Sequence, residues 1–391
     1  MKKILLRGPF LTQSGYGVHA RQIYKWVKSL GVNFDIQVLP WGDTSWYTNP
    51  LELDGMIGEI MMRTKPIEGQ YDVSIQLQLP NEWDTKLAKF NIGVTAAVET
   101  DKCNPRWIEC CNAMDAVVVP SKFTKNVIMN TAAAFGLKVR EPHVVGETFN
   151  EAAYHSSYDT GIDFQTTCNF LIFGQLVARD DDMDRKNVLR AIKLLSTTFS
   201  DDPDVGIVIK TNSGRNSLID RKVTVGSLKT VLDKIPHPRP PVYLLHGNMS
   251  DEEVYSLYKS NKLTALVAPT KGEGFGLPIL EAAACNLPVI ATNWSGHLDF
   301  LESGKFSPIA YKLKQIAPQR VDNNIFMTGT RWADIDNDDF VKRVKRIRAN
   351  SAEARSNALA LGESIRKKFS ERAIFTQWSS AVGYALADSA K

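Results

Sequence analysis

The stretch TKGEGFGLPILEA at residues 270–282 decides which fold the sequence predicts. It follows an apolar run at 264–268 that has the composition of a buried strand. It leads into a helix predicted to begin near Leu277 and Pro278, because proline is tolerated in a first turn. Three glycines within five residues allow the backbone to approach a ligand closely. Since a helix N-terminus adds a positive field, the stretch predicts a phosphate-binding loop between a strand and a helix.

The same stretch carries two carboxylates. Glu273 lies in the loop, and Glu281 lies about one turn inside the predicted helix. Carboxylates accept hydrogen bonds from vicinal hydroxyls, so this pair is predicted to hold a sugar and a ribose. Glycine-rich turns are common in α/β folds, however, and a structural turn with two incidental glutamates fits the spacing almost as well.

Short apolar runs alternate with amphipathic segments along both halves of the chain. This alternation favours a parallel, doubly wound α/β sheet in each half. Ser121 is a candidate N-cap, and the Ser-x-x-Glu sequence at 250–253 fits a capping box. The predicted strands are 4–6, 34–39, 73–77, 92–97, 116–119, 170–173, 205–210, 242–245, 264–268 and 288–291, and the predicted helices include 16–30, 123–130, 187–196, 227–234 and segments within 338–387.

The length of 391 residues exceeds the usual size of one domain, so two domains are expected. The polar segment 147–169 interrupts the alternation and is interpreted as the linker between them. We therefore place a first Rossmann-like domain at 1–165, a second at 166–370 and a final helix at 371–391.

The composition narrows the class of protein. A formal net charge of +4 permits an anionic partner without requiring one. None of the five cysteines belongs to a C-x-x-C pair, so no zinc site is predicted and reduced thiols in the cytoplasm are expected. No apolar run approaches the ~18 residues of a membrane span. The basic run KRVKRIR at 342–348 is interpreted as a solvated amphipathic helix rather than a polyanion-binding stripe.

Three other segments contribute candidate site residues. Arg185 and Lys186 are adjacent cations at the start of a predicted helix, where they could neutralise a diphosphate leaving group. The segment SGYG at 14–17 forms a glycine loop after the first strand, although a tight turn explains it equally well. The segment 94–101 follows a strand and includes Glu99, which is expected to face the site, although a solvent-facing carboxylate is an equally good interpretation.

The stretch 270–282 resembles the E-x7-E signature of retaining GT-B glycosyltransferases, especially those of family four, because seven residues separate Glu273 from Glu281. The sequence PVIATNWSG at 288–296 resembles the next strand and loop of that family. The resemblance implies a GT-B fold, in which two Rossmann-like doubly wound domains face a cleft. It also implies that Glu273 binds the transferred sugar, that Glu281 binds the ribose, and that backbone amides of 274–277 meet the diphosphate and the sugar.

Elements elsewhere in the chain are similar to the same family. Gln175 stands where the family often has an arginine that touches the diphosphate, so Arg185 or Arg179 is expected to supply that charge beside Lys186. Many family members have a histidine near 94–101, and here Glu99 is expected to replace it, with Asp101 as the alternative. The resemblance implies a catalytic role for Glu273, Glu99 and Lys186, and it implies that the donor is bound by Gly15, Gly17, Gln175, Arg185, Lys186, Glu273, Gly274, Phe275, Gly276, Leu277 and Glu281.

The implied activity is the transfer of a hexose or pentose, with retention, from a nucleoside-diphosphate sugar to an acceptor hydroxyl. A UDP-sugar is the expected donor, and no essential metal ion is expected. The domain at 1–165 would bind the acceptor, the domain at 166–370 would bind the nucleotide sugar, and the helix at 371–391 would cross back to the first domain. A glycan, a protein and a hydroxylated nucleic-acid base all stay open as acceptors.

Other functions fit part of the pattern. A GT-B-like phosphorylase or epimerase would share the donor site and act without a large acceptor, and a non-catalytic protein would bind the nucleotide sugar alone. A dinucleotide-dependent oxidoreductase is disfavoured. No strand is followed by G-x-G-x-x-G, a helix and an acidic residue at the expected distance of ~20 residues.

Overall fold

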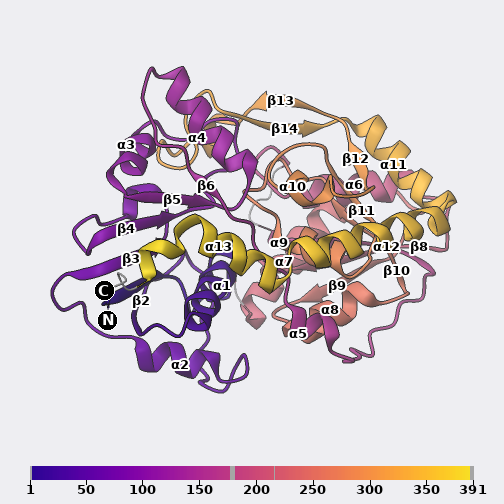
Figure 1. Cartoon of the computed structure of the whole chain (residues 1–391). Coiled ribbons are helices and arrows are strands. Elements are labelled where there is room, and N and C mark those ends of the chain that lie inside the picture. The colour runs from indigo at the N-terminus through magenta and orange to yellow at the C-terminus, as the bar shows by residue number, and fades with distance from the viewer. Residues whose placement is uncertain (1, 177–180, 215, 388–391) are drawn as a thin grey trace.

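The computed structural model describes residues 2–176, 181–214 and 216–387. Two six-stranded parallel sheets, each with helices packed around it, form the two halves of the molecule (Figure 1). The chain builds the first sheet, then the second, and returns to the first with its last helix.

The first sheet contains β1 (Ile4–Gly8), β2 (Phe34–Val38), β3 (Tyr71–Leu77), β4 (Ala88–Val94), β5 (Ala116–Val119) and β6 (His143–Val144). The second contains β7 (Cys168–Phe173), β8 (Val205–Thr211), β9 (Val242–His246), β10 (Leu263–Ala268), β11 (Val289–Thr292) and β12 (Ser307–Ile309). The helices are α1 (Gly15–Ser29), α2 (Met56–Arg63), α3 (Arg106–Ala113), α4 (Lys122–Ala134), α5 (Glu151–His155), α6 (Val188–Thr198), α7 (Leu218–Leu232), α8 (Asp251–Lys259), α9 (Leu277–Ala284), α10 (Leu298–Leu301), α11 (Asn337–Ala349), α12 (Ser351–Lys368) and α13 (Glu371–Leu386).

The strand order is β2-β1-β3-β4-β5-β6 in the first sheet and β12-β11-β10-β7-β8-β9 in the second. In each sheet the chain winds outward in one direction, returns to the middle and then winds in the other direction. This is the doubly wound arrangement, which confirms the predicted fold class. In such sheets ligands bind beyond the carboxyl ends of the strands, at the point where the winding reverses.

The predicted strands are all present, and the predicted capping box is confirmed. The backbone N–H of Glu253 donates to Ser250 Oγ, and the backbone N–H of Ser250 donates to Glu253 Oε2 at 2.7 Å. Some boundaries were wrong. The helix predicted at 227–234 begins instead at Leu218, because Ser217 Oγ accepts from the backbone N–H of Asp220 and caps it. The strand predicted at 92–97 ends at Val94.

The segment predicted as a linker, 147–169, also has structure of its own. It includes α5 and the first residues of β7. The domain limits at 165 and 370 stay predictions, since elements and packing do not by themselves fix a boundary.

The sequence did not predict the antiparallel hairpin of β13 (Tyr311–Gln315) and β14 (Arg331–Ile335), which enclose the short 3-10 helix η2 (Pro318–Arg320). We call residues 311–335 the crossing hairpin. It follows the second sheet, yet its Phe326 and Trp332 are buried in one hydrophobic cluster with Val98 and Trp107 of the first half. The hairpin therefore ties the two halves together (Figure 1).

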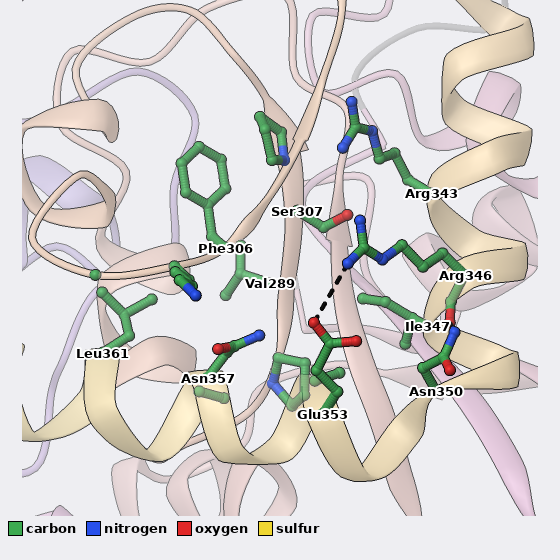
Figure 2. A pocket seen from close by; sticks show the side chains of 16 residues that line it. Val289, Phe306, Ser307, Arg343, Arg346, Ile347, Asn350, Glu353, Asn357 and Leu361 are labelled. Atoms are coloured by element: carbon green, nitrogen blue, oxygen red, sulfur yellow. Dashed lines mark hydrogen bonds and ion pairs between the residues drawn. The ribbon is translucent and has the colours of Figure 1, made fainter.

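A cavity of about 440 Å³ lies where α11 and α12 meet the amino-terminal ends of β11 and β12 (Figure 2). Val289, Ile347 and Leu361 supply apolar wall, and at its rim the Arg346 guanidinium pairs with the Glu353 carboxylate at 3.3 Å. The cavity thus lies at the opposite end of the strands from the edge where doubly wound sheets bind their ligands.

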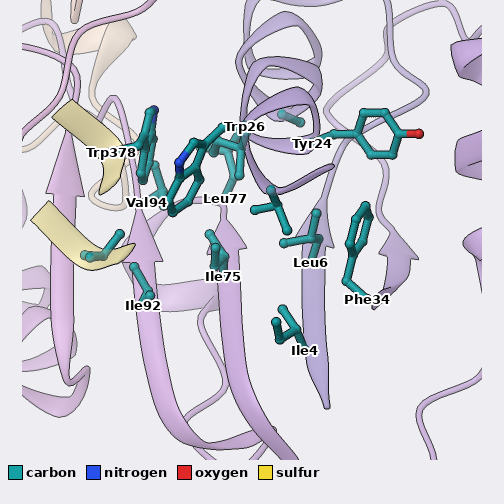
Figure 3. Packing of buried hydrophobic residues seen from close by; sticks show 14 of the residues in the cluster. Ile4, Leu6, Tyr24, Trp26, Phe34, Ile75, Leu77, Ile92, Val94 and Trp378 are labelled. Atoms are coloured by element: carbon teal, nitrogen blue, oxygen red, sulfur yellow. The ribbon is translucent and has the colours of Figure 1, made fainter. Parts of the chain in front are cut away.

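The last helix, α13, completes the core of the first sheet (Figure 3). Trp378 of this helix stacks on Trp26 of α1 with their ring centroids 5.1 Å apart, and Trp26 Nε1 donates to Ser379 Oγ at 3.1 Å. Each large apolar side chain buried in this way contributes roughly 1.5–3 kcal/mol, so the helix is firmly held to the first half. Of the helices that the structure describes, none is long and apolar enough to cross a membrane.

Candidate active site

The glycine-rich loop joins β10 to α9 at the carboxyl end of the second sheet, the edge where a ligand is expected. Gly276 precedes the helix with a φ of +101°, a left-handed conformation that favours glycine. The turn places the N-terminus of α9 and the side chain of Glu273 at the same edge of the sheet, where Glu273 is only 6% exposed.

Glu273 is held by two cations and a hydroxyl. Lys186 Nζ lies 2.6 Å from Glu273 Oε1, the Arg185 guanidinium lies 3.3 Å from Oε2, and Thr270 Oγ1 donates to Oε1 at 2.9 Å. Burial alone would raise the pKa of Glu273, but the charges of Lys186 and Arg185 outweigh it and lower that pKa to about 2. The carboxylate is therefore ionised at neutral pH.

Arg185 also connects the two halves of the molecule. Its guanidinium lies 3.3 Å from Glu99 Oε1, on the loop after β4, and thus serves Glu99 and Glu273 together. Burial lowers the pKa of Arg185, but the two carboxylates more than offset this effect and raise it. Glu99, Arg185, Lys186 and Glu273, all of them residues predicted from the sequence, are thus brought together across the junction.

Arg185 and Arg179 are the predicted candidates for the cation beside Lys186, because Gln175 occupies the position where the family often has an arginine. Gln175 is exposed on the loop after β7 and takes no part in the ion pairs around Glu273. Arg179 lies outside the described residues. Arg185 is therefore the described arginine that faces Glu273, and the place of Gln175 at the donor stays a prediction.

The predicted donor residues of the two glycine loops differ in what their side chains could do. Phe275 is buried, with its ring centroid 5.3 Å from that of Phe300, so only its backbone can face a ligand. At Gly17 a side chain would collide with the carbonyl of Thr12, which gives this glycine a packing role. Gly15 is exposed and has open space around it, so it alone of these three could accommodate a ligand at its Cα.

Two glycines of the 270–282 stretch also have a role that the sequence did not reveal. Cβ atoms at Gly272 and Gly274 would collide with the backbone carbonyls of Glu99 and Ala96 in the first half. Ser121 Oγ donates to the carbonyl of Gly274 at 2.6 Å. The glycines therefore allow the two halves to touch, in addition to any close approach of a ligand.

Glu281 lies in different surroundings from Glu273. It is half-buried in α9, and burial, with smaller contributions from the neighbouring carboxyl groups of Asp251 and Glu147, raises its pKa well above the ordinary value. No cation is paired with it in the described part of the chain. A carboxyl group in these surroundings tends to keep its proton, and it would release that proton to accept hydrogen bonds from the hydroxyls of a ligand.

Glu147 and His19 form a second, fully buried part of this acidic region. Glu147 Oε1 lies 3.9 Å from His19 Nδ1, while Glu147 Oε2 and His19 Nε2 have no hydrogen-bond partner among the described residues. Burial raises the pKa of Glu147 to about 8 and lowers that of His19 to about 3. Both groups are therefore largely uncharged near neutral pH. The His19 ring, on α1, packs near Trp378 with the two ring centroids 6.3 Å apart.

Within residues 2–176, 181–214 and 216–387, no three His, Cys, Asp or Glu side chains gather as a group that could hold a metal ion. That the reaction needs no essential metal ion stays a prediction from the sequence.

One part of the chain, which includes the glycine-rich loop, is similar to a known protein family. Residues 242–353, from β9 into the start of α12, match the family model described as glycosyl transferases group 1. This region includes the glycine-rich loop with Glu273 and Glu281, whereas Arg185, Lys186 and Glu99 lie before it. No curated protein matches the chain.

Solved structures are similar to the whole chain at low sequence identity. A sucrose-phosphate synthase from Thermosynechococcus elongatus is 15% identical, with a TM-score of 0.63 and coverage of 100% of both chains. A glycosyltransferase from Rickettsia africae is 14% identical, with a TM-score of 0.65 and 99% coverage of both chains. The Anabaena protein HepE, solved in complex with UDP-glucose, is 12% identical, with a TM-score of 0.65 and coverage of 98% of this chain and 100% of that one. These likenesses establish the two-domain GT-B fold.

Proposed function

We propose that this chain, which carries a group 1 glycosyltransferase domain on a GT-B fold, is a retaining transferase that moves a sugar from a UDP-sugar to an acceptor hydroxyl. The observation that carries the proposal is the cluster of Lys186, Arg185 and Glu273 beside the N-terminus of α9. Cations and a helix N-terminus attract a diphosphate, and an ionised carboxylate next to them accepts hydrogen bonds from sugar hydroxyls.

The donor would lie along the edge of the second sheet between the two glutamates. Its sugar hydroxyls would donate to Glu273, and its ribose hydroxyls would donate to Glu281. Lys186 has three N–H donors, of which Glu273 takes one, so the others are available to phosphate oxygens. UDP is the first nucleotide to consider because the Anabaena structure, which shares the fold, was solved with UDP-glucose.

The proposed reaction needs no nucleophile from the protein. The bond between the anomeric carbon and the β-phosphate oxygen breaks, and the acceptor oxygen attaches to the same face of that carbon. The acceptor hydroxyl gives its proton to the leaving phosphate, so the products are the glycosylated acceptor and UDP. Lys186, Arg185 and the N-terminus of α9 would stabilise the charge that develops on the diphosphate.

The junction of the two halves supports a site of this kind. Arg185 holds Glu99 of the first half and Glu273 of the second, so both halves must be in contact to assemble the cluster. Glu99 is 25% exposed at its side chain and is the carboxylate of the first half proposed to face the transferred sugar. Contact between domains also excludes water, which would otherwise hydrolyse the donor.

The first experiment is thermal melting of the whole chain with UDP, GDP, ADP, TDP or CDP, each with and without Mg²⁺. A ligand that binds only the folded state raises the melting temperature. We expect a rise with UDP that is lost in Glu281→Ala and kept in the control Glu302→Ala, which alters an exposed glutamate of the same domain. A rise with a different nucleotide would correct the donor, and no rise with any of them would overturn the proposal.

A rise with UDP is then followed by an assay for turnover. Release of UDP from UDP-glucose is measured in the presence of a mixture of glycans, proteins and hydroxymethylated DNA. If UDP binds but is released neither from UDP-glucose nor from other UDP-hexoses and UDP-pentoses, the protein is a non-catalytic nucleotide-sugar binder instead of a transferase.

A further inference from the structure

The crossing hairpin connects the two loops that supply the candidate site. On one side, the backbone N–H of Ala333 donates to the carbonyl of Lys271 at 2.9 Å, directly before the glycine-rich loop. On the other side, the backbone N–H of Asp101 donates to the carbonyl of Arg331 at 2.8 Å, two residues after Glu99. The Arg331 side chain adds an ion pair with Asp101 at 2.9 Å. The hairpin therefore runs beside both Glu273 and Glu99.

One side-chain nitrogen of this hairpin is a buried hydrogen-bond donor without an acceptor among the described residues. Arg320, at the end of η2, lies over the ring of Phe326 with its guanidinium carbon 4.3 Å from the ring centroid. Its Nε is buried and has no hydrogen-bond partner among the described residues. A buried donor without an acceptor is costly, so a group of this kind is expected to gain an acceptor in the working state.

The Arg320 side chain is half-buried in the crossing hairpin. Burial lowers the pKa of Arg320, the Glu99 carboxylate raises it, the Arg185 guanidinium lowers it and the nearby Asp322 carboxylate raises it, so charges from both halves of the molecule act on this guanidinium. The Glu99 carboxylate is already paired with Arg185 at 3.3 Å. Neighbouring residues of the hairpin, Val321 and Phe326, pack in the same cluster as Ala97 and Val98, which precede Glu99.

We propose that Arg320 binds an anionic group, a phosphate or a carboxylate, carried by the acceptor, and so makes the enzyme select charged acceptors. This inference rests on the proposed function, because it places the acceptor beside the sugar held at Glu273. A guanidinium presents a planar set of donors that matches an oxyanion, and stacking on Phe326 fixes its orientation in advance. The diphosphate of the donor is the other anionic group that could bind the Arg320 guanidinium.

The test uses inorganic phosphate, sulfate and acetate as probes of the whole chain, with and without saturating UDP. Saturation with UDP fills the donor site, so an anion that still binds must use another place. We expect phosphate or acetate to raise the melting temperature of the UDP complex. The apparent affinity for that anion should fall about tenfold or more in Arg320→Gln. It should be partly restored in Arg320→Lys, which keeps the charge but not the planar set of donors.

Lys314→Gln is the matched control, because Lys314 lies on the same hairpin and pairs with Asp182 in an exposed position. It should bind the anion as the unchanged protein does. A preference for phosphate or for acetate identifies the class of acceptor. The proposal is overturned if no anion binds the UDP complex or if Arg320→Gln binds it equally well.

The outcomes also separate this inference from the proposed function. If Arg320→Gln lowers the affinity for UDP itself and leaves the affinity for the anion unchanged, Arg320 binds the donor diphosphate, and the acceptor proposal is wrong. If the unchanged protein does not bind UDP at all, the proposed donor site fails, and the anion titration without UDP still shows whether Arg320 holds an oxyanion. If Arg320→Gln only melts at a lower temperature, its role is packing over Phe326.

Discussion

Glu273 and Glu281 belong to one stretch of thirteen residues, yet the protein places them in opposite electrostatic surroundings. Glu273 is paired with Lys186 and Arg185, and its pKa is lowered to about 2. Glu281 has no paired cation among the described residues, and burial, with the neighbouring carboxyl groups of Asp251 and Glu147, raises its pKa well above the ordinary value. The comparison indicates that Glu273, proposed to hold the sugar, already has its partners in the free protein, whereas Glu281, proposed to hold the ribose, lacks the hydrogen bonds that a ligand would bring.

The largest effect is expected from Glu273→Gln. The amide is neutral, so Lys186 loses its charged partner, Arg185 keeps only Glu99, and the sugar proposed to bind here loses an ionised acceptor. Turnover should fall by about 10²–10³-fold, the size seen when one preorganised electrostatic group is removed. The free energy of unfolding should also fall by about 3 kcal/mol, because a largely buried ion pair is broken. Release of UDP and thermal melting measure the two effects.

Glu302→Gln controls for the loss of a negative charge on the surface of the same domain. The melting curve of Glu273→Gln should stay cooperative, since the apolar core around α9 is untouched. Turnover close to that of the control would remove Glu273 from the active site.

Much of this site could be predicted because its residues are close in sequence or follow a strong local pattern. Glu273, Arg185 and Lys186 stand at predicted junctions between strands and helices. Glu281 lies about one turn inside a predicted helix, and Glu99 follows a predicted strand. The doubly wound fold brings the carboxyl ends of those strands to one edge. The alternation of apolar runs with amphipathic segments is also a local pattern, and it predicted both sheets.

The parts that were missed depend on the other half of the molecule. Gly272 and Gly274 touch the backbone of the first half, and no local pattern indicates which backbone will lie there. The crossing hairpin gains its stability from Val98 and Trp107, far away in sequence, so its own residues do not show the periodicity of a strand pair. Arg320 could not be singled out before the hairpin itself was known.

The second effect concerns Glu147, which lies in the same acidic region as Glu281. Its pKa is about 8 in the folded protein, compared with 4.5 as the ordinary value, so the folded state holds a proton that the unfolded state has lost between those two pH values. Stability should therefore fall as the pH rises through this window. Glu147→Gln removes the titration, so its advantage in the free energy of unfolding should be small at pH 5 and should grow by about 1.4 kcal/mol for each pH unit across most of the window up to pH 8.

Thermal melting between pH 5 and pH 8 measures this difference, again with Glu302→Gln as the control. If the advantage of Glu147→Gln does not grow with pH, the buried carboxyl is not held in its protonated form.

A third effect separates the two glutamates directly. Glu281→Gln should lower the affinity for UDP by about tenfold, because hydrogen bonds to a charged acceptor are replaced by bonds to a neutral one. In contrast to Glu273→Gln, it should leave the melting temperature of the free protein unchanged or higher, because it removes a carboxylate that has no cation. Calorimetric titration with UDP and thermal melting test both signs. Equal destabilisation by the two variants would show that the contrast between the two ends of the site is wrong.

The smallest effect is a proton exchanged when UDP binds. Because the pKa of Glu281 is raised in the free protein, part of the population carries a proton there, while ribose hydroxyls prefer to donate to the ionised form. Binding of UDP should therefore release a fraction of a proton, and the affinity should increase with pH until Glu281 is ionised in the free protein. Titrations in two buffers of different ionisation enthalpy at the same pH measure the number of protons released. The release should persist in Glu302→Gln and disappear in Glu281→Gln. A release that persists in Glu281→Gln would assign the proton to another group, with Glu147 as the next to test, and the ribose end of the site would then be controlled by the buried pair of Glu147 and His19.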